Sequence, residues 1–282
     1  MEKITDARQL ALKANDIRVD IINMLLEAGS GHSGGPLGLS DIFACLYFNI
    51  MNVNPKEPKW SERDRFVLSN GHCAPVMYAA MAEKGFFPKE ELMTLRKLGS
   101  RLQGHVDRVY LPGLENTNAS LGQGLGVSSG MAYAAKMDGK QHTVFCGLSD
   151  GECEEGSTWE AAMFAAHYKL DNLIAYVDYN DIQIDGHVHD IMGLEPFAEK
   201  WKAFGWNVIE EDGNDIPSIL KAFEWAKNNR GKGKPSVIVF KTILGKGVSF
   251  MENQYPWHGK PPSKEEAEKA LKELAETRAK LG

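Results

Sequence analysis

The sequence predicts an α/β fold in which a doubly wound, mostly parallel sheet carries helices on both faces. The first observation is that short apolar runs alternate with helical segments along most of the chain. The second is that two buried strands, 143–148 and 173–177, flank a helical run. A strand–helix–strand connection of this kind makes the two strands parallel. We therefore expect one sheet of at least five strands.

The remaining elements follow from the hydrophobic period and from turn residues. The predicted strands are 65–69, 143–148, 173–177, 207–211 and 236–241. The predicted helices are 5–28, 40–48, 74–84, 88–98, 127–136, 157–168, 195–204, 216–228 and 264–281. We expect Ser40 to cap the second helix and Ser157 or Thr158 to cap the central one, with Glu160 in its first turn. The glycine-rich stretch 29–36 is predicted to be a loop.

This pattern predicts a single domain over residues 1–282 that ends in a charged helix at 263–282. The chain has 282 residues, of which 43% are apolar and 25% charged, enough for a large core. A net charge of −6 excludes a strongly basic protein, so we expect neither a nucleic acid nor a membrane as partner. The polar beginning of the chain predicts a cytoplasmic protein, and the four cysteines are interpreted as reduced core residues.

Polar residues follow both strands of the central unit. Asp150 comes after the strand 143–148, and Asn180 comes after the strand 173–177. Because parallel strands end at the same edge of a sheet, we expect these side chains to meet where open α/β sheets bind ligands. With the backbone carbonyl of Ile182 they form a set of oxygen donors that suits Mg²⁺ or Ca²⁺, with a diphosphate as companion. Ordinary turns at both positions are the alternative interpretation.

The same stretch resembles a known cofactor motif. It reads Asp-Gly, two residues, Glu-Glu-Gly, three residues, Glu, then a helix, Lys-Leu-Asp-Asn-Leu-Ile and Asn180. This is similar to the thiamine diphosphate motif of transketolases, and the similarity covers about residues 10–262 in family order. Ser149 and Ala119 depart from the pattern, since the family usually has glycine at both positions. Val106-Asp107 likewise replaces the usual Pro-Glu.

The resemblance implies thiamine diphosphate and Mg²⁺ as cofactors, with Ca²⁺ or Mn²⁺ as substitutes for Mg²⁺. In the family the metal is held by the positions that match Asp150, Asn180 and Ile182. The residues that the resemblance assigns to cofactor binding are His72, Leu121, Gly122, Gly151, Glu155, Glu160, Asn180 and His258. For Glu155 and Glu160 a proton relay between paired sites and a plain position near a helix N-terminus are both open.

Histidines on glycine-rich loops are the second group of candidates. His32, His72, His105 and His258 each lie beside a glycine, and an imidazole changes charge near pH 6.5. Taken singly, each is an ordinary turn residue. The resemblance to transketolases makes these four the catalytic histidines, which hold the hydroxyls of donor and acceptor sugars. The other histidines, at 142, 167, 187 and 189, match no family position and are interpreted as structural.

The function that the resemblance implies is the transfer of a two-carbon ketol unit from a ketose phosphate to an aldose phosphate, as in the pentose phosphate pathway. Transketolases continue with a pyrimidine-binding domain that holds the activating glutamate, and no segment here resembles it. We therefore expect a hetero-oligomer with a carboxy-terminal transketolase subunit, two copies of each chain. The alternatives are a deoxyxylulose-phosphate synthase-like or 2-oxo acid dehydrogenase subunit, and a cofactor-binding module without turnover.

Overall fold

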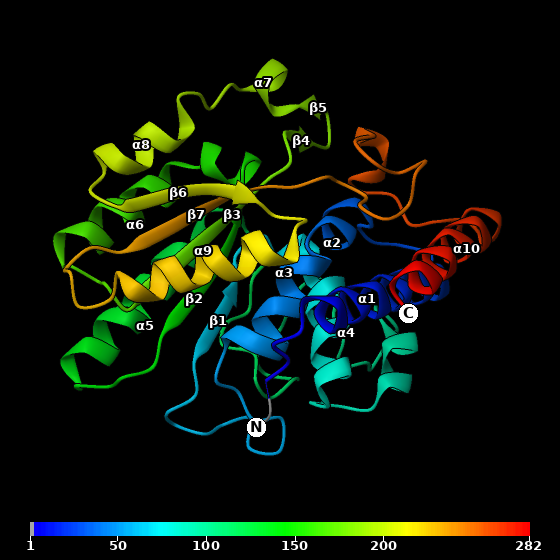
Figure 1. The fold of residues 1–282 in the computed structure, drawn as a ribbon, viewed down its shortest axis with the longest axis horizontal. Coiled ribbons are helices and arrows are strands. Elements are labelled where there is room, and N and C mark those ends of the chain that lie inside the picture. The colour runs from blue at the N-terminus through cyan, green and yellow to red at the C-terminus, as the bar shows by residue number, and fades with distance from the viewer. Residues whose placement is uncertain (1–2) are drawn as a thin grey trace.

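The structure, a computed structural model that describes residues 3–282, is built on one five-stranded sheet (Figure 1). Its strands lie in the order β1-β2-β3-β7-β6, and every neighbouring pair is parallel. Their bounds are Arg65–Leu68, Val144–Ser149, Leu173–Tyr179, Ser236–Lys241 and Asn207–Asp212, in that order across the sheet. The predicted doubly wound, mostly parallel sheet is therefore confirmed. A separate hairpin joins β4 (Ile182–Gln183) to β5 (Gly186–His187).

Alternate residues along the central strands serve two different cores. Phe145, Tyr176 and Phe240 point into the larger core, whereas Cys146 and Val177 point into the other. This follows from the two-residue period of a strand, because successive side chains leave opposite faces of the sheet. Both faces are apolar, as expected for parallel strands that are covered on both sides.

Helices cover each face. The larger core takes residues from α1 (Ala7–Ala28), α3 (Ser40–Cys45), α4 (Ala74–Lys84), α9 (Ile216–Asn228) and α10 (Lys264–Leu281). The other takes residues from α5 (Gln123–Met137), α6 (Gly156–His167) and α8 (Phe197–Ala203). The shorter turns are α2 (Gly34–Gly38), the π-helix Leu46–Ile50, α7 (Val188–Ile191) and the 3₁₀ turns Gly71–Cys73, Lys89–Thr94, Gly151–Glu154 and Tyr255–Trp257.

Several local predictions were wrong at helix ends. The central helix α6 begins at Gly156 with Glu155 as its N-cap, so Glu160 lies beyond the first turn. Ser157 and Thr158 do not cap it, because their hydroxyls donate instead to the carbonyls of Gly122 and Glu152, at 3.1 and 3.3 Å. The partner of Ser157 lies 35 residues away in the sequence and cannot be read from local spacing.

Two further segments differ from prediction. The predicted loop 29–36 contains the start of α2, and Ser40 donates its hydroxyl to the carbonyl of Pro36 at 3.0 Å instead of capping α3. The predicted helix 88–98 is only a 3₁₀ turn, Lys89–Thr94, after which Arg96 adopts a left-handed φ of 61°. A bulky residue in that conformation ends a helix.

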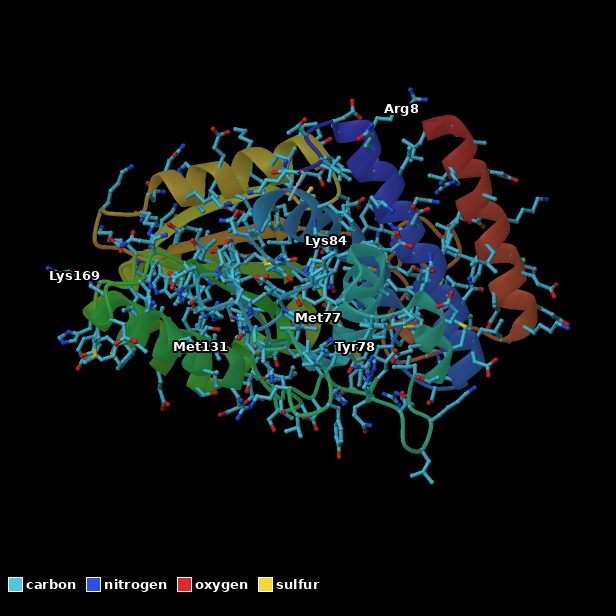
Figure 2. All side chains as sticks on the ribbon, turned by 90° about the horizontal axis from the view of Figure 1, so that it is seen from below. Arg8, Met77, Tyr78, Lys84, Met131 and Lys169 are labelled. Carbon is cyan, nitrogen blue, oxygen red and sulfur yellow. The ribbon has the colours of Figure 1, made fainter. Side chains whose placement is uncertain are left out.

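The terminal helix α10 packs along α1 (Figures 1 and 2). Ser263 and Glu266 form a reciprocal capping box at its start, and Ala267, Ala270 and Leu274 are buried on its inner face. Arg8 on α1 donates to the carbonyls of the last two residues (Figure 2). These are the longest helices, and within residues 3–282 no helix is both long and apolar enough to span a membrane.

A buried ion pair connects α1, α3 and the loop after β6. Arg18 donates to both carboxylate oxygens of Asp41, at 3.2 and 2.5 Å, and each side chain is 8% exposed. Asn214 donates to the same carboxylate at 3.0 Å, and Arg18 also donates to the carbonyl of Leu37 at 3.3 Å. The charges are therefore paired and hydrogen-bonded, which a buried ion pair requires.

Asp41→Ala should lower the free energy of unfolding by about 3–5 kcal/mol, because it leaves the Arg18 guanidinium buried without its partner. Urea denaturation measures this. The matched control is Glu199→Ala, which breaks the exposed pair of Glu199 with Lys202 and should cost less than about 1 kcal/mol. Equal effects of the two substitutions would contradict the structural importance of the Arg18–Asp41 pair.

Candidate active site

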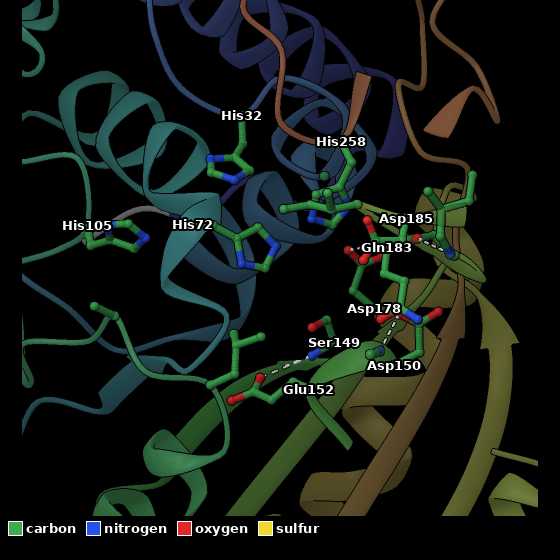
Figure 3. Close-up of a pocket in the computed structure, with 17 residues that line it drawn as sticks. His32, His72, His105, Ser149, Asp150, Glu152, Asp178, Gln183, Asp185 and His258 are labelled. Atoms are coloured by element: carbon green, nitrogen blue, oxygen red, sulfur yellow. Dashed lines mark hydrogen bonds between the residues drawn. The ribbon is translucent and has the colours of Figure 1, made fainter. Parts of the chain in front are cut away.

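A cavity of about 280 Å³ opens at the carboxyl edge of the sheet (Figure 3). The ends of β2 and β3 and the hairpin β4–β5 form one wall, and loops that carry histidines form the opposite one. The lining residues are His32, Gly35, His72, His105, Ala119, Leu121, Ser149, Asp150, Gly151, Glu152, Asp178, Asn180, Ile182, Gln183, Ile184, Asp185 and His258. The parallel pairing of β2 with β3 thus brings Asp150 and Asn180 into one site, as predicted.

Asp150 is the most strongly perturbed acid of this wall. It is 1% exposed and accepts hydrogen bonds from the backbone N–H groups of Gly151 and Asp181, at 2.8 and 2.6 Å. Burial, followed by the nearby carboxylate of Asp178, raises the pKa of Asp150 to about 8. The backbone hydrogen bonds oppose this shift without cancelling it.

Asp178 and Asn180 lie beside it. Asp178 is 2% exposed, accepts from the Thr242 hydroxyl and from the Asn180 amide, and its pKa is raised to about 6 by burial. The amide oxygen of Asn180 accepts from the N–H of Ile182 at 2.9 Å, which holds this turn closed. None of these partners carries a positive charge, so the two buried acids lie together without a cation that would balance their ionised forms.

Glu152 lines the cavity and joins three segments of the chain. It is fully buried, and its carboxylate accepts from the Ser69 hydroxyl, from the Gly122 N–H at 2.7 Å and from the Ser149 N–H at 3.3 Å. Burial raises the pKa of Glu152 to about 7, although these hydrogen bonds favour its charged form. The carboxylate therefore fixes the end of β1, the loop before α5 and the end of β2 relative to one another.

Gly122 sits at a position that permits no side chain. Its φ is 80°, and a Cβ there would lie 2.4 Å from the hydroxyl oxygen of Ser157 and 2.7 Å from the Cβ of Glu155. Only glycine adopts this conformation freely and fits the space. The close contact allows the Gly122 N–H to reach Glu152.

Three histidines gather opposite the acids (Figure 3). The ring centroids of His32 and His72 are 5.2 Å apart, and that of His258 lies 5.8 and 5.2 Å from them. His105 lines the same cavity at its other end. Burial, then the nearby imidazole of His258 and the charge of Arg96, lowers the pKa of His32 to about 4.

Burial also lowers the pKa of His72, His105 and His258, so the cluster is neutral at neutral pH. A neutral imidazole has one nitrogen that donates a hydrogen bond and one that accepts. The cluster is thus able to hold hydroxyl groups and to pass protons between them, across a cavity from buried carboxylates.

The structure brings most of the predicted site residues together. The residues that line the cavity are His32, His72, His105, Leu121, Asp150, Gly151, Asn180, Ile182 and His258. Gly122 lies just behind the wall, and Glu155 and Glu160 are exposed on or next to α6 outside the lining. Ser149 and Ala119, the two departures from the family pattern, both line the cavity.

Sequence reasoning missed Glu152, Asp178, Gln183 and Asp185, which also line the cavity. Asp178 carried a signal, because it is a charged residue inside the otherwise apolar strand Leu173–Tyr179. Glu152 carried none that was local, since its partners Ser69 and Gly122 are distant in the sequence.

The chain matches known proteins over almost its entire length. A family model described as transketolase, thiamine diphosphate binding domain, matches residues 9–280. A 6-deoxy-6-sulfo-D-fructose transketolase subunit from a Clostridium species is 45% identical over 262 residues, which cover 93% of this chain and 94% of that protein. One subunit of the apulose-4-phosphate transketolase from Phocaeicola vulgatus is 40% identical over 272 residues, with 96% of each chain covered.

A solved structure agrees with these matches. The transketolase of Campylobacter jejuni superposes with a TM-score of 0.88 at 34% identity and covers 95% of this chain. The chain spans 43% of that larger protein. Since the family model, the relatives of similar length and the fold agree, the chain belongs to the transketolase family and carries its thiamine diphosphate-binding domain.

Proposed function

We propose that this chain is the diphosphate-binding subunit of a two-chain transketolase, which moves a two-carbon ketol unit from a ketose phosphate to an aldose phosphate. The observation that carries the proposal is one cavity with neutral imidazoles on one wall and buried acids on the other. Sugars present many hydroxyls, and a cluster of imidazoles supplies matching donors and acceptors. A 2-oxo acid has fewer hydroxyls to hold, so the related 2-oxo acid enzymes fit this wall less well.

The acid wall fits a divalent cation. Asp150 and Asp178 are buried carboxylates whose hydrogen-bond donors are all uncharged. Buried charges need a counter-ion, and oxygen donors favour Mg²⁺ or another hard cation such as Ca²⁺ or Mn²⁺. We assign Asp150, Asn180 and the carbonyl of Ile182 as its ligands. Asp178 orients Asn180 through the hydrogen bond of 3.1 Å between them.

Thiamine diphosphate, when bound, supplies the carbon chemistry of the transfer. The residues assigned to it are His72, Leu121, Gly122, Gly151, Glu155, Glu160, Asn180 and His258. Gly151 opens a 3₁₀ turn at the end of β2, and a Cβ there would lie 3.4 Å from Oε1 of Gln183, in contact with another side chain that lines the cavity. His32, His72, His105 and His258 hold the sugar hydroxyls and move protons at their oxygens.

Relatives support a second polypeptide in the enzyme. The Phocaeicola protein is named as one subunit of its transketolase and has nearly the length of this chain, whereas this chain spans 43% of the Campylobacter transketolase. We propose a carboxy-terminal subunit that supplies the remaining half of the site, with two copies of each chain in a cytoplasmic hetero-oligomer. The pentose phosphate pathway is the proposed setting.

A second donor class is favoured by one relative. The Clostridium protein at 45% identity is named for 6-deoxy-6-sulfo-D-fructose, a sugar with a sulfonate instead of a phosphate. The Phocaeicola protein at 40% identity is named for apulose 4-phosphate. Both names describe a sugar with a terminal anion. Assays should therefore compare ketose phosphates with a sulfonated ketose as donor.

Asp150→Ala should weaken thiamine diphosphate binding by at least about tenfold, roughly 1.4 kcal/mol, because the diphosphate loses the cation that neutralises it. Calorimetry at fixed Mg²⁺ concentration measures the affinity. The control is Asp138→Ala, which removes an exposed acid at the end of α5. Unchanged, Mg²⁺-dependent affinity in Asp150→Ala would refute the metal assignment.

His32→Ala should lower kcat/KM for ketol transfer by at least about tenfold while the cofactor affinity stays near that of wild type. The reason is that His32 is assigned to sugar hydroxyls and not to the diphosphate. Steady-state kinetics and calorimetry on the same preparation separate the two effects. His142→Ala, at the opposite edge of the sheet before β2, is the control. Loss of cofactor with unchanged kinetic constants would mean that this role of His32 is wrong.

The chain alone should show no ketol transfer when saturated with Mg²⁺ and thiamine diphosphate, and activity should appear when the carboxy-terminal subunit is added. The physical reason is that the acid wall described here serves only the diphosphate end of a two-ended ligand. The assay follows transfer from xylulose 5-phosphate to ribose 5-phosphate, and a sulfonated ketose donor is run in parallel. Full activity without a second polypeptide would overturn the two-chain proposal.

A further inference from the structure

Three potential metal ligands meet at the base of the hairpin β4–β5, outside the lining of the cavity. They are Asp181, His187 and His189, and their ligand atoms all lie within 4.8 Å of one another. Asp181 directly precedes β4, His187 ends β5 and His189 lies in α7. The two strands pair through Ile182 and His187, so the hairpin itself brings the three side chains together.

The carboxylate of Asp181 faces both imidazoles. Its Oδ2 lies 2.5 Å from Nδ1 of His189 and 3.2 Å from Nδ1 of His187, while its Oδ1 accepts from the His189 N–H at 3.0 Å. The two imidazole rings are 5.2 Å apart. Asp181 reaches this position with a left-handed φ of 60°, a conformation that aspartate tolerates better than most residues.

Nδ1 of His187 is the unexplained atom of this group. It is buried and makes no hydrogen bond within residues 3–282, although it lies near the carboxylate. The side chains as wholes are accessible, with 43% of His187 and 61% of His189 exposed. An ion can therefore approach the group from the solvent side of His189 and Asp181, and water can complete its coordination.

We propose that Asp181, His187 and His189 form a binding site for a transition-metal ion, best matched by Zn²⁺. Two imidazole nitrogens and one carboxylate oxygen are a donor set of zinc sites, whereas Mg²⁺ prefers oxygen alone. Ligand atoms around a tetrahedral zinc ion are about 3.3 Å apart, given bonds of about 2.0 Å. The closest pair, 2.5 Å apart, would have to separate to that distance, and the exposed side chain of His189 has room to rotate.

An ion at this site would hold together the two ends of the hairpin that forms part of one wall of the cavity. Residues Ile182 to Asp185 line the cavity and lie between Asp181 and His187 in the sequence. The N–H of Asp181 also donates to Oδ2 of Asp150 at 2.6 Å. This hydrogen bond connects the proposed zinc site to the cation site assigned to Asp150. The ion would be distinct from the cation assigned to Asp150, because none of its three ligands belongs to the cavity lining.

An ordinary helix cap is the competing explanation. In that case the carboxylate only forms hydrogen bonds with His189, through its backbone N–H and through Nδ1 of its imidazole. Asp181→Asn separates the two explanations, because the amide oxygen still accepts that hydrogen bond but is a far weaker zinc ligand. Unchanged thermal stability without metal then verifies that the variant is folded.

The test is calorimetric titration of the purified full chain with Zn²⁺ in excess Mg²⁺. The Mg²⁺ occupies the cation site assigned to Asp150 and Asn180. Wild type should bind one equivalent of Zn²⁺. Each of the variants Asp181→Asn, His187→Ala and His189→Ala should lower the affinity for Zn²⁺ by at least about tenfold. His167→Ala, at the end of α6, should bind like wild type. Co²⁺ in place of Zn²⁺ should give the visible absorption of a nitrogen- and oxygen-ligated tetrahedral ion, and the same three variants should lose it.

The cavity histidines are the other place where zinc could be captured, so His72→Ala is titrated in parallel. If that variant loses the bound equivalent while His187→Ala and His189→Ala keep it, the proposal is wrong. Absence of zinc binding to wild type, or equal affinity in wild type and all three cluster variants, would overturn it as well.

Discussion

The parallel register of β2 with β3 is the constraint on which the site depends. It pairs Ser149 with Asp178 and leaves Asp150 at the next position, where its N–H donates to the Asp178 carbonyl at 3.1 Å. Two carboxylates are thereby held together at a dry edge of the sheet, and the pKa of each is raised. The chain tolerates this arrangement because backbone N–H groups and neutral side chains satisfy the oxygens. A bound cation would offset the repulsion between the carboxylates of Asp150 and Asp178. The strand register therefore also sets the geometry of the proposed cation site.

The eight histidines divide according to their surroundings and not according to their sequence neighbours. His32 and His187 each lie next to a glycine, yet His32 faces other imidazoles in a cavity and His187 faces a carboxylate at the base of a hairpin. Neutral imidazoles among themselves favour hydroxyl ligands, whereas imidazoles beside a carboxylate favour a metal ion or a hydrogen bond. The flanking glycine indicates only that both residues lie on turns.

Sequence reasoning found the fold because its signals are local. The bounds of α9, α10 and β7 agree with prediction, since each is marked by a cap, a proline or a continuous apolar run. It also placed Asp150 and Asn180 at one edge, because parallel strands leave no other arrangement. It failed where a residue distant in the sequence determines the local structure. Ser157 is an example, because its hydroxyl donates to the carbonyl of Gly122 instead of capping α6. For the same reason Glu152 was missed, since only the folded chain brings Ser69 and Gly122 to it.

The side chains of the central strands are divided between two cores, and this division affects how the molecule unfolds. β3 is paired on both edges and packed on both faces, with Tyr176 in one core and Val177 in the other. Neither core is able to loosen fully while β3 keeps its place, because adjacent residues of one backbone anchor both. We therefore expect local fluctuations in peripheral segments such as the hairpin, and we expect the amide hydrogens of β3 to exchange with solvent mainly through global unfolding.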